Sequence, residues 1–188
     1  QYNISPETFV GRMDMPSIDT LVDGEWRCSD RSTTYAANGC RYMQDRQGFL
    51  AALMEKMYED RSKYKKMSIE AKKKYEETKN TEDQKLIARY HNLQLAKKIQ
   101  LNSAYGALAN EYFRWFNFNH AEAITTSGQL SIRWIERKMN EFMNSLMKTD
   151  RRDYVIASDT DSIYINMGPV IERLGINDKP DAEISKII

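Results

Sequence analysis

Two aspartates, Asp159 and Asp161, stand one residue apart between two apolar runs. The runs at 154–157 and 163–165 are rich in β-branched and aromatic residues, which predicts two short strands joined by a tight turn. Mg²⁺ prefers oxygen ligands held in fixed geometry, so paired carboxylates on such a turn could bind it. A solvated turn is the alternative, because aspartate is favoured in turns for its local hydrogen bonds.

A second group of polar side chains lies on a long stretch of helix formers. Arg61 and Lys65 are one helical turn apart. Lys98, Asn102 and Tyr105 follow the i, i+4, i+7 spacing that places three residues on one helix face. Three cations beside an amide and an aromatic ring could hold a triphosphate and stack against a base. A chance register on a solvated helix is the alternative.

The elements that must position these cations are predicted to be two antiparallel helices. From Phe49 to Gly106 the chain has almost no glycine or proline, and its apolar residues keep helical spacing. A break falls at 79–81, where Thr81 and Gln84 predict a capping box for the second helix. Another possible break lies at Met67-Ser68.

The lengths of the two arms predict which cations meet. The 18 residues from Arg61 to Lys79 span roughly 27 Å of helix, and the 17 from Thr81 to Lys98 span about 25 Å. The arms match, so we expect Lys98 to lie opposite Arg61 and Lys65 at the base of a helical hairpin.

The remaining pattern predicts an α+β protein. Asn38-Gly39, between segments 33–37 and 40–43, is typical of a β-hairpin turn. Residues 11–32 are expected to be irregular, and 112–116 to be an extended aromatic segment of the core. An amphipathic helix at about 121–147 is expected to turn its apolar face inward over a sheet.

Composition and charge narrow the class of protein. The 188 residues are 41% hydrophobic and 29% charged, and no apolar run is long enough to span a bilayer. Cys28 and Cys40 lack metal-ligand spacing, which favours a reduced, intracellular protein. Residues 61–100 carry 12 basic and 5 acidic side chains, which indicates either an anionic partner or a solvated lysine-rich face. Both chain ends are expected to lie within a larger protein.

Two motifs resemble those of family B DNA polymerases. The segment 97–108, KKIQLNSAYGAL, is similar to their fingers motif, and 158–164, SDTDSIY, is similar to their palm motif with its paired aspartates. Segments 3–8 and 124–129 look most like the replicative polymerases of T-even-type tailed phages. The resemblance covers nearly the whole chain in the right order.

The resemblance implies a role for each candidate residue. Asp161 would be a ligand of two catalytic Mg²⁺ ions, with Asp159 in a supporting role. The phosphates of the incoming nucleotide would be held by Arg61, Lys65 and Lys98. The nascent base-pair pocket would be lined by Asn102 and Tyr105.

The resemblance also implies domains and partners. Residues 1–48 would be the N-terminal part of a polymerase palm, 49–110 the fingers hairpin, and 111–188 the rest of the palm. The palm would be an antiparallel sheet with covering helices. Partners would be primer–template DNA, a deoxynucleoside triphosphate, and the exonuclease, thumb and upstream palm strand, with no membrane. The location would be the cytoplasm of a phage-infected bacterium.

Three departures from the family pattern bear on activity. Ser158 stands where phage relatives usually carry glycine, and only 36 residues separate Arg61 from Lys98, which shortens the hairpin tip. The third concerns the metals: two-metal chemistry needs carboxylates on both sides of the ion pair. In the family, the second essential aspartate lies on a strand upstream of the segment that matches Gln1.

The aspartates near the start of the chain offer no substitute, since Asp14, Asp19 and Asp23 lie in the segment predicted to be irregular. We therefore expect an incomplete metal site and a chain that is inactive by itself. The leading hypothesis is part of a DNA-directed DNA polymerase. The alternatives are a split-polymerase subunit that needs a partner chain, and a non-catalytic nucleic-acid-binding module of polymerase ancestry.

Overall fold

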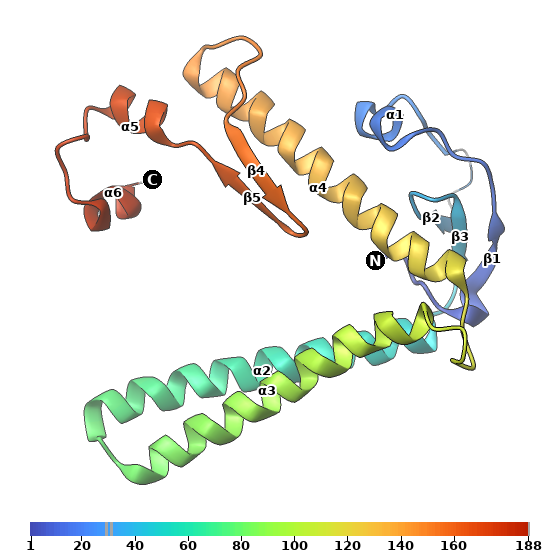
Figure 1. Cartoon of the computed structure of the whole chain (residues 1–188), viewed down its shortest axis with the longest axis horizontal. Coiled ribbons are helices and arrows are strands. Elements are labelled where there is room, and N and C mark those ends of the chain that lie inside the picture. The colour runs from blue at the N-terminus through green and yellow to red at the C-terminus, as the bar shows by residue number, and fades with distance from the viewer. Residues whose placement is uncertain (29, 31, 188) are drawn as a thin grey trace. The chain divides into compact units, whose positions relative to one another are not determined.

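The computed structural model describes residues 1–28, 30 and 32–187, and the chain forms two compact units. The first unit comprises Gln1–Met15 and Cys28–Thr125, and the second comprises Pro16–Arg27 and Thr126–Ile188. Each unit combines helices with a small antiparallel sheet, so the predicted α+β class is confirmed (Figure 1).

A three-stranded antiparallel sheet in the order β1-β3-β2 begins the first unit. The bounds are η1 (a 3₁₀ turn) Pro6–Thr8, β1 Phe9–Arg12, β2 Thr33–Tyr35 and β3 Cys40–Met43. The predicted hairpin is confirmed, because Thr33 pairs with Met43 and Tyr35 with Arg41 around Asn38-Gly39. Gly39 has a φ of +84°, a left-handed conformation that glycine adopts without a Cβ clash.

Two long antiparallel helices follow the sheet. Helix α2 spans Phe49–Thr78 and helix α3 spans Thr81–Leu108, and they lie side by side (Figure 1). The predicted helical hairpin is therefore confirmed. The predicted break at Met67-Ser68 is wrong, because α2 continues through these residues and Ser68 is buried.

The tip of the helical hairpin is closed by a helix cap and by an ion pair whose carboxylate is buried. Asn80, and not the predicted Thr81, caps α3, because the Asn80 side chain accepts a hydrogen bond from a first-turn N–H at 3.0 Å. Asp83 is only 2% exposed. Its carboxylate lies 3.2 Å from Lys74 Nζ and accepts a 2.9 Å hydrogen bond from Thr78 Oγ1, so the buried charge is paired.

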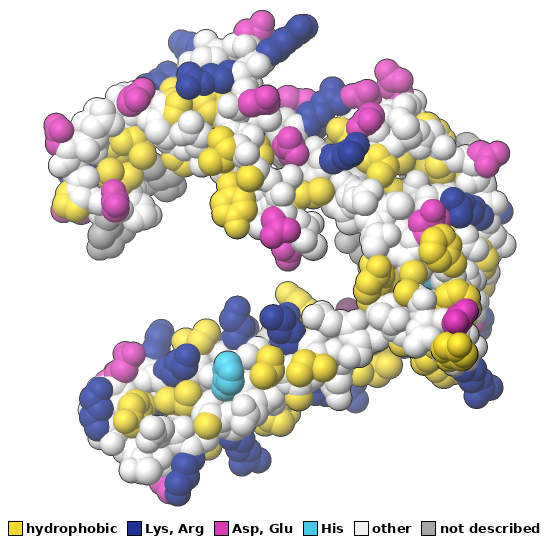
Figure 2. Space-filling model, viewed as in Figure 1, with side chains coloured by type: hydrophobic (Ala, Val, Ile, Leu, Met, Phe, Trp, Pro, Cys, Tyr) yellow, Lys and Arg dark blue, Asp and Glu magenta, His cyan; other side chains and the backbone are white. Residues whose placement is uncertain are grey.

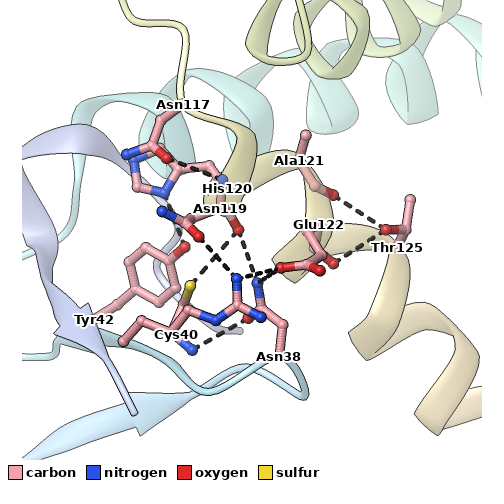
Figure 3. A network of polar contacts seen from close by, with 10 residues as sticks. Asn38, Cys40, Tyr42, Asn117, Asn119, His120, Ala121, Glu122 and Thr125 are labelled. Atoms are coloured by element: carbon pink, nitrogen blue, oxygen red, sulfur yellow. Dashed lines mark hydrogen bonds and ion pairs between the residues drawn. The ribbon is translucent and has the colours of Figure 1, made fainter. Parts of the chain in front are cut away.

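The core of the first unit lies between the sheet and the start of helix α4, which spans Phe118–Met147. The buried cluster, with the residues packed against it, consists of Ala36, Cys40, Tyr42, Ala123, Ile4 and Phe9. Buried His120 of α4 has its Nδ1 2.9 Å from Tyr42 Oη (Figure 3). The His120 ring also meets the Phe9 ring edge-on. No role was predicted for His120 from the sequence, and in the structure it is a core residue.

The buried position of His120 predicts a pH-dependent stability. Burial lowers the pKa of His120 below its ordinary value of 6.5. Because the folded-state pKa is the lower one, the unfolded chain takes up the proton more readily. The stabilisation is complete above about pH 6.5 and is lost as pH falls through the folded pKa, by at most ~1.4 kcal/mol per pH unit.

Urea unfolding between about pH 8 and 5, above the range of ordinary carboxylates, measures this loss. The His120→Gln variant should show a flatter profile over that window. An equally steep profile in the variant would contradict the assignment.

Besides most of α4, the second unit contains five short elements. Their bounds are α1 Ile18–Asp23, β4 Val155–Asp159, β5 Ser162–Ile165, α5 Gly168–Leu174 and α6 Asp181–Ile187. The expectation of irregular structure at 11–32 is wrong in part. Pro16 and Gly24 lie just outside α1 instead of interrupting it, and Ser17 Oγ caps the helix by accepting from the Thr20 N–H.

Two predictions about aromatic residues are wrong. The predicted inward face of α4 is largely open, since Trp134 is 49% and Phe142 60% exposed. Segment 112–116 forms turns, and Tyr112 is 89% exposed. The described strands of the second unit number only two, which is too little surface to cover a 30-residue amphipathic helix. Across the described residues, no helix combines the length and apolarity needed to cross a membrane.

Candidate functional site

The paired aspartates lie at the tip of a two-stranded hairpin, as predicted. β4 and β5 are antiparallel, and Asp159 faces Ser162 as the last pair of the register. Thr160 and Asp161 therefore form the connection. Thr160 has a φ of +50°, and the Asp161 N–H donates to the Asp159 carbonyl at 2.5 Å, which makes a tight three-residue turn. This turn holds the two carboxylates close together.

The two carboxylates differ in what they contact. Asp159 Oδ1 accepts a hydrogen bond from Thr160 Oγ1 at 3.0 Å, and its main-chain carbonyl accepts from Ser162 Oγ at 3.1 Å. Asp161 is exposed, and its carboxylate has no hydrogen bond or ion pair with any described residue. Asp161 is thus the carboxylate available to an external ligand, and Asp159 is partly engaged within the turn.

The donor set of this turn fits part of a magnesium site. Exposed carboxylate oxygens on rigid backbone are ligands that Mg²⁺ accepts, and Mg²⁺ is usually held by one or two carboxylates together with water and substrate phosphates. Over the described part of the chain, no cluster of three or more His, Cys, Asp or Glu side chains could hold a metal ion. The hairpin therefore offers two carboxylates and no more.

Two asparagines of α4 hold the strand that carries the aspartates. Asn140 Oδ1 accepts hydrogen bonds from the N–H groups of Tyr154 and Val155 at 2.8 and 3.0 Å. Asn144 accepts from the Arg152 N–H and donates to the Arg152 carbonyl. Asparagine in a helix is a weak former, and its spacing of four residues here is the only sequence signal for this role.

Asn140→Ala should loosen the entry to β4. An unpaired donor costs about 1–3 kcal/mol, so we expect amide hydrogen exchange at Tyr154 and Val155 to speed up roughly 30-fold. Ser145→Ala, an exposed change on the same helix, is the matched control and should leave those amides unchanged. Unchanged exchange in Asn140→Ala would show that the asparagine does not hold the strand.

The acidic residues of α1 form ion pairs with arginines of α4. Asp19 pairs with Arg133 of α4 at 2.6 Å, and Asp23 pairs with Arg137. They line a charged groove of about 700 Å³ that contains none of the predicted site residues. The hydrogen bonds that Arg137 donates to Asp23 and Glu141 hold the pKa of Arg137 above its usual range. Within the second unit, Asp19 and Asp23 thus act as ion-pair partners of α4.

The helical hairpin sets the register of the predicted phosphate-binding cations. Asp60 of α2 and Lys97 of α3 form an ion pair of 2.9 Å. Because the two helices run in opposite directions, Arg61 lies one residue nearer the tip and Lys98 one residue nearer the base, a difference of about 3 Å along the hairpin. Lys65 lies one turn further along α2. Figure 2 shows Lys and Arg side chains along the length of this hairpin.

None of the five predicted nucleotide-binding side chains has a polar partner among the described residues. They are Arg61, Lys65, Lys98, Asn102 and Tyr105. Four are exposed, and Arg61 is half-buried with its Nε shielded from solvent and without a hydrogen bond. A buried donor without an acceptor is costly, so Arg61 is suited to a ligand that supplies one.

A groove of about 790 Å³ lies at the base of the hairpin. Its walls include Tyr58, Leu101 and Tyr105 of the two helices and the segment 1–4. The lining is mainly apolar, which suits the flat face of a nucleobase. The first unit carries the cations and Tyr105, of which only Tyr105 lines the groove, and the second unit carries both aspartates.

The comparison with protein families decides the ancestry. The model described as DNA polymerase family B matches residues 1–184. The chain belongs to DNA polymerase family B.

Two phage proteins are similar to this family B chain over nearly its full length. One is a DNA-directed DNA polymerase of Escherichia phage RB69, 28% identical over 216 residues, which covers 93% of the chain and 24% of the relative. The other is a DNA-directed DNA polymerase of Enterobacteria phage T4, 30% identical over 218 residues, with 94% and 24% covered. The chain thus spans about a quarter of the length of the curated relatives it matches.

A solved family B structure is similar in fold. It is the polymerase of the hyperthermophilic archaeon Pyrobaculum calidifontis, with a TM-score of 0.51 and 24% identity. The match covers 92% of this chain and 19% of that one. The likeness extends the family assignment from sequence to fold.

Proposed function

We propose that this family B chain supplies the nucleotide-binding hairpin and the aspartate hairpin of a DNA-directed DNA polymerase. The reaction is attack of a primer 3′-hydroxyl oxygen on the α-phosphorus of a deoxynucleoside triphosphate, directed by a template. A new P–O ester bond forms, the α–β phosphoanhydride bond breaks, and pyrophosphate leaves with the electron pair. The observation that carries the proposal is the exposed carboxylate of Asp161, which has no polar partner among the described residues, on a tight turn.

The helical hairpin would bind the nucleotide. Arg61, Lys65 and Lys98 would contact the triphosphate, and charge-assisted hydrogen bonds to its oxygens favour a fixed orientation. Asn102 and Tyr105 would line the pocket of the nascent base pair. Their polar groups are free for this purpose, and Tyr105 already borders the apolar groove.

The aspartate hairpin would hold the metal. Asp161 would be the direct ligand of Mg²⁺ and Asp159 would support the turn, because its carboxylate is already hydrogen-bonded to Thr160. When bound, a pair of divalent ions stabilises the attacking and leaving oxygens of such a displacement. Asn140 would keep the strand in place for this.

Within this proposal the parts take the names of the polymerase domains. Residues 1–48 and 111–188 would belong to the palm and 49–110 would be the fingers. Partners would be primer–template DNA, the nucleotide, and the exonuclease, thumb and further palm segments. Since the matched relatives are phage proteins, the site of action would be the cytoplasm of an infected bacterium.

The 188-residue polypeptide taken alone should bind nucleotide weakly and incorporate none. Two-metal transfer needs carboxylates on both sides of the ions, and the aspartate turn supplies one side. Line broadening of amide NMR signals by Mn²⁺ tests the metal assignment in this polypeptide without turnover. Signals at 159–162 should broaden first, and Asp161→Asn should remove the effect. Broadening that is unchanged in the variant would disprove it.

Activity is tested in a chimaera in which this chain replaces the matched segment of the T4 phage polymerase. Template-dependent extension by the chimaera supports the polymerase assignment. Extension by a mixture of this chain with the remaining segments as a separate chain would favour a split subunit. DNA binding without extension or Mn²⁺ binding would favour a non-catalytic module of polymerase ancestry.

A further inference from the structure

The contact between α2 and α3 changes character along the helical hairpin. Residues facing the partner helix recur at spacings of three and four on both helices. Near the base they are mainly apolar: Leu50, Met54 and Met57 of α2, with Leu101, Ala104 and Leu108 of α3. Midway the shielded residues are mixed: Arg61, Tyr64, Met67 and Ser68 of α2, with Tyr90, Leu93, Gln94 and Lys97 of α3. The apolar contact that is continuous at the base is therefore interrupted by polar and charged residues midway.

Two ion pairs link the helices beyond the base, and the described residues make no others between α2 and α3. Asp60 pairs with Lys97 at 2.9 Å, and Lys74 pairs with Asp83 at 3.2 Å. Fourteen residues separate the two pairs on each helix, a rise of about 21 Å on both. Because the separations are equal, both ion pairs form in the same register of α2 against α3, and both stabilise that register.

The Asp60–Lys97 pair lies at the level of the cations. Asp60 directly precedes Arg61, and Lys97 directly precedes Lys98. The side chains of the pair are 34% and 27% exposed, so solvent screens them only in part. The hydrogen bond from Lys97 lowers the pKa of Asp60, with nearby Lys56 and Lys63 adding to the effect. The carboxylate is therefore ionised and paired at neutral pH.

We propose that Asp60 and Lys97 are positioning residues whose ion pair sets the spacing of Arg61 and Lys98, and so the affinity for a nucleoside triphosphate. The inference rests on the proposed function, since it assumes that Arg61 and Lys98 contact the triphosphate. Neither Asp60 nor Lys97 needs to touch the nucleotide. The pair acts where polar and charged residues interrupt the apolar contact between the helices.

The direction in which Asp60→Asn changes the affinity for triphosphate distinguishes a positioning role from a simple electrostatic effect. Asp60 is a negative charge near a site for an anion, so its removal alone should tighten triphosphate binding. Loss of the spacing should weaken binding instead. Asp60→Asn thus has opposite expected signs under the two explanations.

The test is an NMR titration of the full 188-residue chain with dATP, and with dAMP as the probe that lacks the two outer phosphates. Asp60→Asn should weaken dATP binding roughly fivefold, the size expected for coupled neighbours, and leave dAMP binding unchanged. Lys97→Gln should behave in the same way. The charge-reversed pair Asp60→Lys with Lys97→Asp should restore most of the dATP affinity.

The ion pair nearer the tip is the matched control. Asp83→Asn breaks an ion pair whose carboxylate is nearly fully buried, although its Lys74 partner is largely exposed, so it should lower the melting temperature more than Asp60→Asn does. It should nevertheless change dATP affinity less. A dATP affinity that follows melting temperature across these variants would show a general structural role and overturn the proposal.

Tighter dATP binding in Asp60→Asn, or no recovery in the charge-reversed pair, would also overturn it. A failure of the proposed function itself would give a different result in the same titration. If Lys98→Ala leaves dATP affinity unchanged, the triphosphate assignment itself is wrong, whatever the Asp60 variants do.

Discussion

Asp161→Asn in the T4 chimaera is expected to lower the rate of primer extension about a thousandfold or more, equivalent to ~4 kcal/mol of transition-state stabilisation. The change removes one negative charge and keeps the side-chain shape. Asp161 is the aspartate of the turn without a polar contact to described residues, so its loss leaves no protein contact broken. The effect should therefore fall on the reaction and leave stability and DNA affinity near wild type.

Two further aspartate variants test whether the loss of activity is specific to Asp161. Asp159→Asn should cost less, because the carboxylate of Asp159 is shared with Thr160 inside the turn. Asp178→Asn makes the same chemical change at an exposed residue of the second unit and should keep full activity. Full extension by Asp161→Asn, or a larger loss in Asp159→Asn, would reverse the assigned roles.

Lys98→Ala should weaken dATP binding by about 10- to 100-fold, since a hydrogen bond to a charged group contributes about 1.5–3 kcal/mol. In the chimaera the same loss should appear mainly as a higher KM. Lys98 is exposed and forms no ion pair with described residues, so unfolding by urea should be unchanged.

Lys85→Ala provides the comparison on the same helix. Lys85 is exposed and pairs with Glu82 within α3, and no candidate site residue contacts it. Its removal should alter dATP affinity by less than twofold in the screened surface environment. Equal losses in the two variants would mean that only the net charge of the hairpin attracts the nucleotide.

Short-range patterns in the sequence were the reliable basis for predicting secondary structure. The apolar runs around Asp159 and Asp161 specified β4 and β5, and the long stretch without glycine or proline specified the helical hairpin. These features depend on local propensity and turn chemistry, which neighbouring residues set. The short helix α1 was missed because Pro16 and Gly24 suggested irregular structure, although they fall at its ends.

The resemblance of segments 97–108 and 158–164 to family motifs, in the right order along the chain, was sufficient to predict family B ancestry, which the comparison confirmed. Tertiary structure alone decided the rest. It made His120 a core residue, gave Asn140 the task of holding β4, buried Asp83 and paired Asp60 with Lys97. Each of these depends on which side chains meet across separate elements, and such contacts leave no periodic signal in the sequence.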